Sequence, residues 1–268
     1  MPVVDVQGHK LNYLEEGDGP AILFVSGMTM NLIPWTIYQK DFFVDAGYKV
    51  IVFDNRDTGS SEMSRSGAYS VSDLAQDAVG LLDSLEIESA HVVGYSLGGM
   101  IALDMAVNFP NRLDSLIVLG STARQLESEK NLVTVVKSAK KNLSNEEFWR
   151  FMANKVMSWR FFENPESVER WFGFVTSDLN AQSVDALCRQ ADSCINFDIE
   201  EQLGSIQLPT QVIVGAEDTM LPPHHSELIA KGISHAKFCV IPNAAHAAYS
   251  ECAPEFNSKV LEFISSIS

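Results

Sequence analysis

The most constraining feature of this sequence is the alternation of short apolar runs with longer segments of helical periodicity. The apolar runs of the first half lie at 21–27, 48–55, 90–96 and 113–121. Each is short and continuous, as expected of a strand buried on both faces. Segments with apolar residues every three or four positions lie between or after them, at 34–47, 71–87 and 97–110. This alternation predicts a parallel sheet covered by helices.

The ends of two segments carry turn and cap signals. Residues 3–17 form two extended stretches that meet at Gly8-His9, which predicts an N-terminal hairpin. In the segment 71–87, an apolar stripe of five residues marks one helix face. We expect Ser72 to be the N-cap residue of this helix, because its hydroxyl can accept a hydrogen bond from a free backbone amide.

The alternation stops between residues 122 and 207. Helical segments follow one another there without intervening strands, at 143–159, 164–175 and 178–194. Ser144 and Glu147 have capping-box spacing at the start of the first. Three of the four tryptophans fall in this region, namely Trp149, Trp159 and Trp171. Rings at helical spacing usually pack in a core, and we expect a share of them to line a cavity that the helices cover.

After residue 208 strands and helices alternate again, at 210–218, 222–233, 236–246 and 254–267. The predicted fold class is therefore α/β, with a mostly parallel central β-sheet flanked by helices and with an inserted helical cap. The predicted boundaries are 1–121 for the first part of the core, 122–207 for the cap and 208–268 for the second part of the core.

Composition excludes several function classes. Of the 268 residues, 46% are hydrophobic and 20% are charged, which is typical of a globular protein. The formal net charge of −16 disfavours nucleic acid and anionic membranes as partners, because both are negatively charged. We see neither a secretory signal nor an apolar run of about 20 residues that could span a membrane. The four cysteines lack metal-like spacing, so we expect reduced thiols in a cytoplasmic protein.

Ser96 lies in the segment Gly94-Tyr95-Ser96-Leu97-Gly98, between an apolar strand and an apolar helix. A sharp strand-to-helix turn leaves no room for bulky neighbours, and glycine at 94 and 98 removes the Cβ atoms that would collide. The strained serine would present its Oγ at the carboxyl edge of the sheet, as in a nucleophile elbow. A glycine-rich turn with an incidental serine is the alternative. The glycine spacing and the missing lysine disfavour a phosphate-binding loop.

A serine nucleophile needs a general base, and the chain has six histidines. Five lie in a hairpin turn or at the start of a strand or helix, namely His9, His91, His224, His225 and His235. For the adjacent pair 224–225, which follows two prolines, we expect a solvated or capping role. His246 alone lies just beyond the carboxyl end of a late strand, from where it could reach Ser96. A structural histidine is the alternative there.

The orienting acid is expected after the preceding strand, which ends in the sequence VIVGAED. We choose Asp218, because it stands in the turn that follows this strand and precedes two prolines. Glu217 is the alternative, since the two carboxylates differ by one position in a loop. No carboxylate follows closely after the strand at 113–121.

Together these segments resemble the alpha/beta-hydrolases of the esterase, cofactor-free haloperoxidase and C–C-bond hydrolase type, over nearly the full chain. DNRDTGSSE at 54–62 is similar to the D-x-R-G-x-G-x-S loop of that family. The segments IQLPTQVIVGAEDTMLPP and IPNAAHAAYSECAPEFNSKVLEFI are similar to its two C-terminal signatures. The family order of nucleophile, acid and base corresponds to Ser96, Asp218 and His246. This chain has RDTG where the family loop has R-G-x-G. Arg56 and Asp57 of this segment could be a structural ion pair and not a mark of one branch of the family.

The resemblance also implies an oxyanion hole made by the backbone amides of Met28 and Leu97. The family commonly has His-Gly after the third strand, where this chain has Ser26-Gly27. A backbone donor tolerates this change, but the support that the histidine often gives to the loop must come from elsewhere. Ala245 stands where glycine is usual before the catalytic histidine, which is a mild departure.

These residues imply a serine hydrolase that cleaves a small to medium, largely apolar carboxylic ester through an acyl-enzyme. No metal or organic cofactor is expected. The substrate would enter between core and cap, and the expected pocket residues are Gly27, Met30, Trp35, Tyr95 and Trp159. The expected partner is a small molecule, and the chain would act as a monomer or homodimer.

Other functions fit the same residues. A perhydrolase or haloperoxidase would use the same triad with peroxide in place of water. A C–C-bond hydrolase would need cationic groups for an acidic substrate, for which Arg124 and Arg160 are the candidates. Epoxide and haloalkane hydrolases are disfavoured, because they use aspartate where this chain has Ser96. A small-molecule receptor with little turnover is the alternative outside the enzymes.

Overall fold

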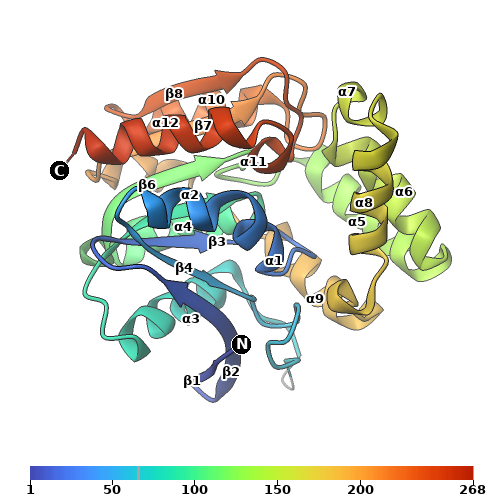
Figure 1. Ribbon diagram of the computed structural model, residues 1–268, viewed down its shortest axis with the longest axis horizontal. Coiled ribbons are helices and arrows are strands. Elements are labelled where there is room, and N and C mark those ends of the chain that lie inside the picture. The colour runs from blue at the N-terminus through green and yellow to red at the C-terminus, as the bar shows by residue number, and fades with distance from the viewer. Residues whose placement is uncertain (65–66, 268) are drawn as a thin grey trace.

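The apolar runs form the strands of one central sheet in the computed structural model, which describes residues 1–64 and 67–267 (Figure 1). The strands are β1 Val3–Val6, β2 His9–Glu16, β3 Ala21–Val25, β4 Lys49–Phe53, β5 Ala90–Tyr95, β6 Leu113–Leu119, β7 Thr210–Gly215 and β8 Lys237–Ile241. Their order in the sheet is β1-β2-β4-β3-β5-β6-β7-β8. Strand β2 pairs antiparallel with β1 and β4, and every later pairing is parallel. The predicted fold class is confirmed.

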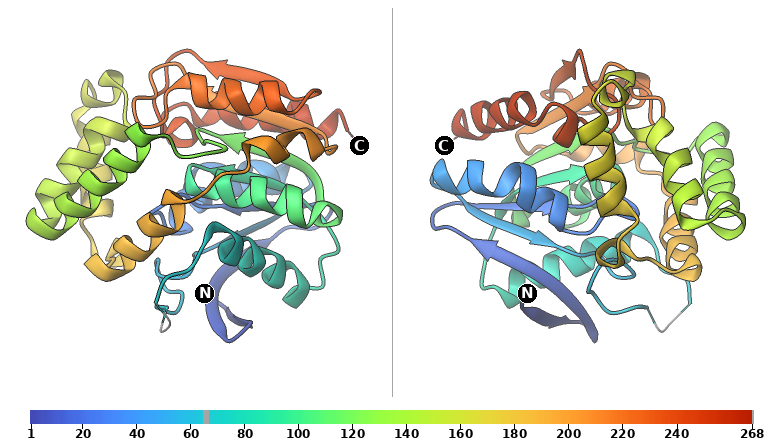
Figure 2. Two further views of the ribbon diagram at one scale, coloured as in Figure 1. Left: turned by 180° about the vertical axis from the view of Figure 1, so that it is seen from behind. Right: turned by 45° about the vertical axis from the view of Figure 1, so that its right-hand side comes forward.

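Helices cover both faces of the sheet, and alternate residues of each strand point to opposite faces. Ile22 and Phe24 pack beneath one layer, whereas Leu23 and Val25 pack beneath the other. The first layer consists of α1 Ile33–Trp35, the π-helical turn η1 Thr36–Lys40, α2 Asp41–Asp45, α11 Ala248–Glu251 and α12 Ala253–Ser265. The second layer consists of α3 Val71–Ser84, α4 Leu97–Asn108 and α10 Pro223–Gly232 (Figure 2).

A group of helices between β6 and β7 lies to one side of the sheet, beyond the carboxyl ends of its parallel strands (Figures 1 and 2). These cap helices are α5 Glu127–Asn142, α6 Asn145–Val156, α7 Trp159–Phe162, α8 Pro165–Val175 and α9 Val184–Ile195. They share a small apolar core of their own, in which Phe148 and Leu187 are fully buried. Short 3-10 turns complete the chain, namely η2 Pro110–Arg112, η3 Asp178–Asn180 and η4 Glu200–Ser205. A helical insertion between β6 and β7 is thus present, as the predicted fold class includes.

The structure corrects one cap prediction and confirms another. The N-cap of α3 is Ser70, whose hydroxyl accepts from the Asp73 amide at 3.2 Å. Ser72 lies within the first turn and donates to Asp104 of α4 at 2.6 Å instead. Ser144 forms the predicted capping box, since its hydroxyl accepts from the Glu147 amide at 3.2 Å.

All four cysteines are free thiols, and burial raises the pKa of Cys194 to about 12. No helix within the described residues combines the length and the apolar character that a membrane crossing requires. The parallel strands end at a common edge below the cap, so the loops after β3, β5, β7 and β8 meet there.

Candidate active site

Ser96 occupies a strained turn between β5 and α4. Its φ of 55° and ψ of −117° place a non-glycine residue in a sparsely populated backbone region. A Cβ at Gly94 would collide with the Gly98 carbonyl, and a Cβ at Gly98 would collide with the Val25 carbonyl. The two glycines are therefore required by close backbone contacts, as the sequence argument expects. The Ser96 carbonyl accepts from the Ser121 hydroxyl at 2.8 Å, so the loop after β6 helps to hold the turn.

The loops after β5, β7 and β8 bring three side chains into one hydrogen-bonded chain. His246 Nε2 lies 3.0 Å from Ser96 Oγ, and His246 Nδ1 lies 2.7 Å from Asp218 Oδ2. The other oxygen, Asp218 Oδ1, accepts from the amides of Met220 and Leu221, each at 2.9 Å. Asp218 and His246 are each 3% exposed. Both oxygens of the carboxylate are thus hydrogen-bonded, and the carboxylate fixes the imidazole orientation.

Glu217, the alternative acid, points away from this chain. Its carboxylate forms an ion pair with Arg160 of the cap helix α7, and its side chain is 29% exposed. One position along the loop therefore separates a carboxylate that contacts the imidazole from one that contacts the cap.

His225 differs from its expected solvated or capping role. It is 1% exposed, and its Nδ1 lies 3.2 Å from the hydroxyl of Thr122. Its Nε2 lies 3.2 Å from the Glu129 carboxylate of α5, so the residue joins α10 of the core to the cap. Burial lowers the pKa of His225, with the nearby Glu129 carboxylate opposing. No sequence pattern predicts this contact, because Thr122 and Glu129 lie about a hundred positions from His225 along the chain.

The loop after β3 faces the elbow. A Cβ at Gly27 would lie 3.1 Å from Ser96 Cβ, so the loop backbone passes directly over the serine. Within residues 1–64 and 67–267, neither the Met28 amide nor the Leu97 amide has an acceptor, and Leu97 is the first residue of α4. Backbone amides without an acceptor, one on the loop over the serine and one at the start of α4, are the kind of donor that an oxyanion hole uses.

Other residues replace the support that a histidine often gives this loop. Trp35 Nε1 donates to Ser26 Oγ at 3.0 Å, and Asn55 Nδ2 donates to the Ser26 carbonyl at 3.0 Å. Asp54 Oδ1 accepts from the Leu32 amide at 2.7 Å. Burial raises the pKa of Asp54, although amides and the Asn12 side chain donate to it. The motif DNRDTGSSE contains residues 54 and 55, but the motif alone does not predict that they support this loop.

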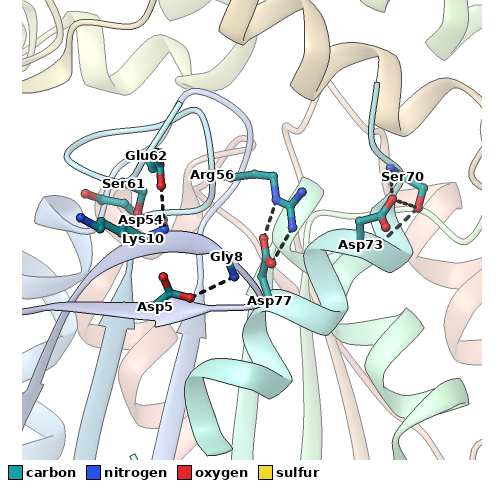
Figure 3. A network of polar contacts seen from close by, with 10 residues as sticks. All are labelled: Asp5, Gly8, Lys10, Asp54, Arg56, Ser61, Glu62, Ser70, Asp73 and Asp77. Carbon is teal, nitrogen blue, oxygen red and sulfur yellow. Dashed lines mark hydrogen bonds and ion pairs between the residues drawn. The ribbon is translucent and has the colours of Figure 1, made fainter. Parts of the chain in front are cut away.

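Arg56 and Asp57 do not pair with each other. Arg56 donates to both oxygens of Asp77 at 2.6 Å, and Figure 3 shows this pair beside the N-terminal hairpin. Asp57 instead accepts two hydrogen bonds from Arg189 of the cap helix α9, at 2.8 and 2.7 Å. The predicted Arg56–Asp57 ion pair is therefore wrong, because each residue pairs with a different element. Arg56 joins the loop to α3, and Asp57 joins it to the cap.

A cavity of about 680 Å³ lies between the core edge and the cap and reaches Ser96 and His246. Its lining is mostly apolar, and its rings and thioethers include Met28, Met30, Tyr95, Trp149, Met152, Phe161, Trp171 and Phe174. Burial raises the pKa of Tyr95, so its phenol stays neutral. The volume suits a ligand of small to medium size.

Three expected pocket residues do not line this cavity. Trp35 is fully buried beneath it, where its ring packs on Phe24 and Tyr249 at centroid distances of 5.0 and 4.9 Å. Trp159 is 57% exposed on the outside of the cap, because α7 turns that face to solvent. Gly27 lies behind its neighbour Met28 and contacts the elbow.

Charged groups in the cavity are few. Arg160 reaches it but is paired with Glu217, and the exposed Arg170 lies at its rim. Arg124 lies elsewhere and pairs with Glu200 at 2.6 Å. No three His, Cys, Asp or Glu side chains in the described part of the chain gather as a metal site requires.

Glu251 also borders the cavity, and it joins the base loop to the cap. One oxygen accepts from the Ala245 amide and the other from the Ser158 amide, each at 2.8 Å. A backbone hydrogen bond of 2.9 Å from the Ala247 amide to the Val156 carbonyl runs beside them. The residues on both sides of His246 are therefore attached to the junction between α6 and α7.

The profile described as alpha/beta hydrolase fold matches residues 20–252. The chain belongs to this family. It is 29% identical to 3-oxoadipate enol-lactonase 2 of Acinetobacter baylyi over 264 residues, covering 93% of this chain and 91% of that protein. It is 26% identical to the 2-hydroxy-6-oxo-6-phenylhexa-2,4-dienoate hydrolase of Comamonas testosteroni, covering 97% and 93%. The structure is similar to a thermophilic esterase from Thermogutta terrifontis, with a TM-score of 0.87, 25% identity, and coverage of 100% and 99%. The chain is thus an alpha/beta hydrolase.

Proposed function

We propose that this alpha/beta hydrolase is a serine esterase for small to medium, largely apolar carboxylic esters. The observation that carries the proposal is the hydrogen-bonded chain from Ser96 through His246 to Asp218 at the floor of an apolar cavity. Two of the similar proteins are named an esterase and an enol-lactonase, and a lactone is a cyclic ester.

The geometry supports a mechanism with two half-reactions. His246 Nε2 takes the proton of Ser96 Oγ as this oxygen attacks the ester carbonyl, and Asp218 stabilises the imidazolium. The amides of Met28 and Leu97 bind the negative charge on the carbonyl oxygen. His246 then gives its proton to the departing alkoxide, which leaves as the alcohol. Water attacks the acyl-enzyme by the same route, and Ser96 is restored.

The charges around the cavity favour an uncharged ester over an acidic dienoate. Arg160 is the only arginine of the two predicted candidates that reaches the cavity, and Glu217 already pairs with it. An anionic substrate group would have to displace that carboxylate or extend to Arg170 at the exposed rim. The apolar lining, by contrast, gains free energy from any acyl chain that fits.

The experiment compares the wild type with Ser96→Ala on p-nitrophenyl esters of increasing acyl length. We expect Ser96→Ala to lower kcat by at least about 10⁴-fold, since loss of the nucleophile disables the whole chain of residues. A fluorophosphonate should label Ser96 in the wild type, and His246→Ala should block the labelling. Ser84→Ala, on the outer surface of α3, is the matched control and should retain full activity. Full turnover by Ser96→Ala contradicts the proposal.

A further inference from the structure

The wall of the cavity beside the triad has an apolar part and a polar part. Four side chains of the apolar part belong to or pack against the apolar core of the cap, namely Trp149, Met152, Phe174 and Val175. Met28 packs against the same core, so the apolar part adjoins the loop that passes over Ser96. The segment 243–252, which contains His246, brings polar side chains to another part of the wall, namely Asn243, Tyr249, Ser250 and Glu251.

Tyr95 belongs to the polar part and lies beside the imidazole. The centroid of its ring lies 5.0 Å from that of His246 and 4.8 Å from that of Tyr249. The ring of Trp35 packs on it at 6.5 Å. Only 6% of Tyr95 is exposed, and the residue lines the cavity. Neighbouring rings therefore enclose Tyr95, and the surface that it retains faces the cavity.

The hydroxyl of Tyr95 has no hydrogen-bond partner among residues 1–64 and 67–267. A buried phenol usually has one, because an unpaired buried hydroxyl costs free energy. The unpartnered side-chain atoms that the described residues enclose completely do not include this hydroxyl, so it keeps accessible surface. Since burial raises the pKa of Tyr95, the hydroxyl stays protonated and can donate. Tyr95 thus directs a free donor into the cavity.

The proposed mechanism determines which part of an ester lies beside this donor. His246 Nε2 gives its proton to the departing alkoxide, so the leaving oxygen must lie within hydrogen-bond reach of that nitrogen. The alcohol part of the ester therefore begins beside the imidazole, on which Tyr95 packs. The carbonyl oxygen faces the amide of Met28, whose side chain adjoins the apolar part of the wall. That part is accordingly available to the acyl chain.

We propose that Tyr95 is a specificity residue, which donates a hydrogen bond to a second, uncharged hydroxyl on the alcohol part of the substrate. The substrates are then monoesters of short diols with an apolar acyl group. This inference rests on the proposed esterase function and names its alcohol class. An alkyl alcohol of the same size would leave the phenol unpaired in an enclosed site, whereas a hydroxyl can accept its hydrogen bond.

The experiment measures kcat/KM on pairs of butyrate esters of equal length. The 2-hydroxyethyl, 3-hydroxypropyl and 4-hydroxybutyl esters are compared with the propyl, butyl and pentyl esters, in which a methyl group replaces the hydroxyl. In the wild type, we expect at least one hydroxylated ester to exceed its methyl counterpart. Tyr95→Phe keeps the ring and removes only the hydroxyl, so it should lower the ratio of kcat/KM within that pair by about fivefold to thirtyfold.

Tyr69→Phe is the matched control. Tyr69 is 8% exposed, but its hydroxyl is completely enclosed and the residue does not line the cavity. The substitution should leave the ratio within every pair of esters within about twofold of the wild-type ratio.

Two results would overturn the inference while leaving the esterase proposal intact. The first is a wild type that hydrolyses every methyl counterpart faster than its hydroxylated ester. The second is an unchanged ratio in Tyr95→Phe, because an equal effect on both esters would mean that the hydroxyl acts on the enzyme or on the shared acyl part. If the wild type hydrolyses no ester, the proposed function fails. Calorimetry then tests the subsite without turnover: at least one hydroxylated ester should bind the wild type about fivefold tighter than Tyr95→Phe, and equal Kd values for all three overturn the inference.

Discussion

Glu251→Gln is a direct test of how the base loop is held. The carboxylate accepts two charge-assisted hydrogen bonds of 2.8 Å, from the amides of Ala245 and Ser158. Hydrogen bonds to a charged group contribute about 1.5–3 kcal/mol each, and glutamine retains one acceptor oxygen while turning its NH₂ group toward the other amide. Since Glu251 is only partly buried, we expect a loss of about 1–2 kcal/mol in the free energy of unfolding.

For a chain of this size, each kcal/mol lowers the melting temperature by about 2–4 °C, so Glu251→Gln should melt about 2–8 °C below the wild type. The effect on catalysis has a different cause. Ala245 precedes His246, and a displacement of the imidazole by even a fraction of an ångström weakens its contact with Ser96. We expect kcat to fall about threefold to thirtyfold, measured with a p-nitrophenyl ester well below the melting temperature.

Glu255→Gln is the matched control, because this glutamate lies one turn further along the chain and, among the described residues, pairs only with Lys259, at 3.7 Å. Its loss should change the free energy of unfolding by less than about 0.5 kcal/mol and leave kcat unchanged. The reasoning is refuted if Glu251→Gln and Glu255→Gln behave alike in both measurements.

Two further predictions concern buried charges. The pKa of His225 is lowered in the folded state. Between that lowered pKa and the ordinary value of about 6.5, the unfolded chain therefore binds more protons than the folded chain. The free energy of unfolding should fall as the pH drops below about 6.5, by up to about 1.4 kcal/mol per pH unit from this residue. His225→Gln should flatten that slope in urea titrations between pH 5 and 8, and an unchanged slope would contradict the assignment. Asp77→Asn leaves the buried Arg56 unpaired and should cost about 3–5 kcal/mol by chemical denaturation, whereas the apolar double variant Arg56→Met, Asp77→Leu should recover most of it. A small loss in the single variant would show that the pair is not desolvated.

The sequence by itself determined the architecture and the position of the candidate site. Short apolar runs separated by helical periodicity define a parallel sheet, because strands buried on both faces need helices on both sides. Parallel strands share one carboxyl edge, so Ser96, Asp218 and His246 could be expected to meet although they are far apart in the chain. The requirement for glycine at 94 and 98 could also be predicted from the sequence, because a tight turn leaves no room for Cβ atoms at these neighbouring positions.

Only the tertiary structure decided which side chains touch across long separations. Arg189 and Asp57 are 132 positions apart, and no pattern along the chain relates the guanidinium in the cap to the carboxylate in the core loop. The same holds for Trp35, which the sequence placed in the pocket and the structure places beneath it. Periodicity reports which face of an element is buried, because that depends on neighbours three or four positions away. What covers that face depends on how distant elements pack, and this is a property of the whole fold.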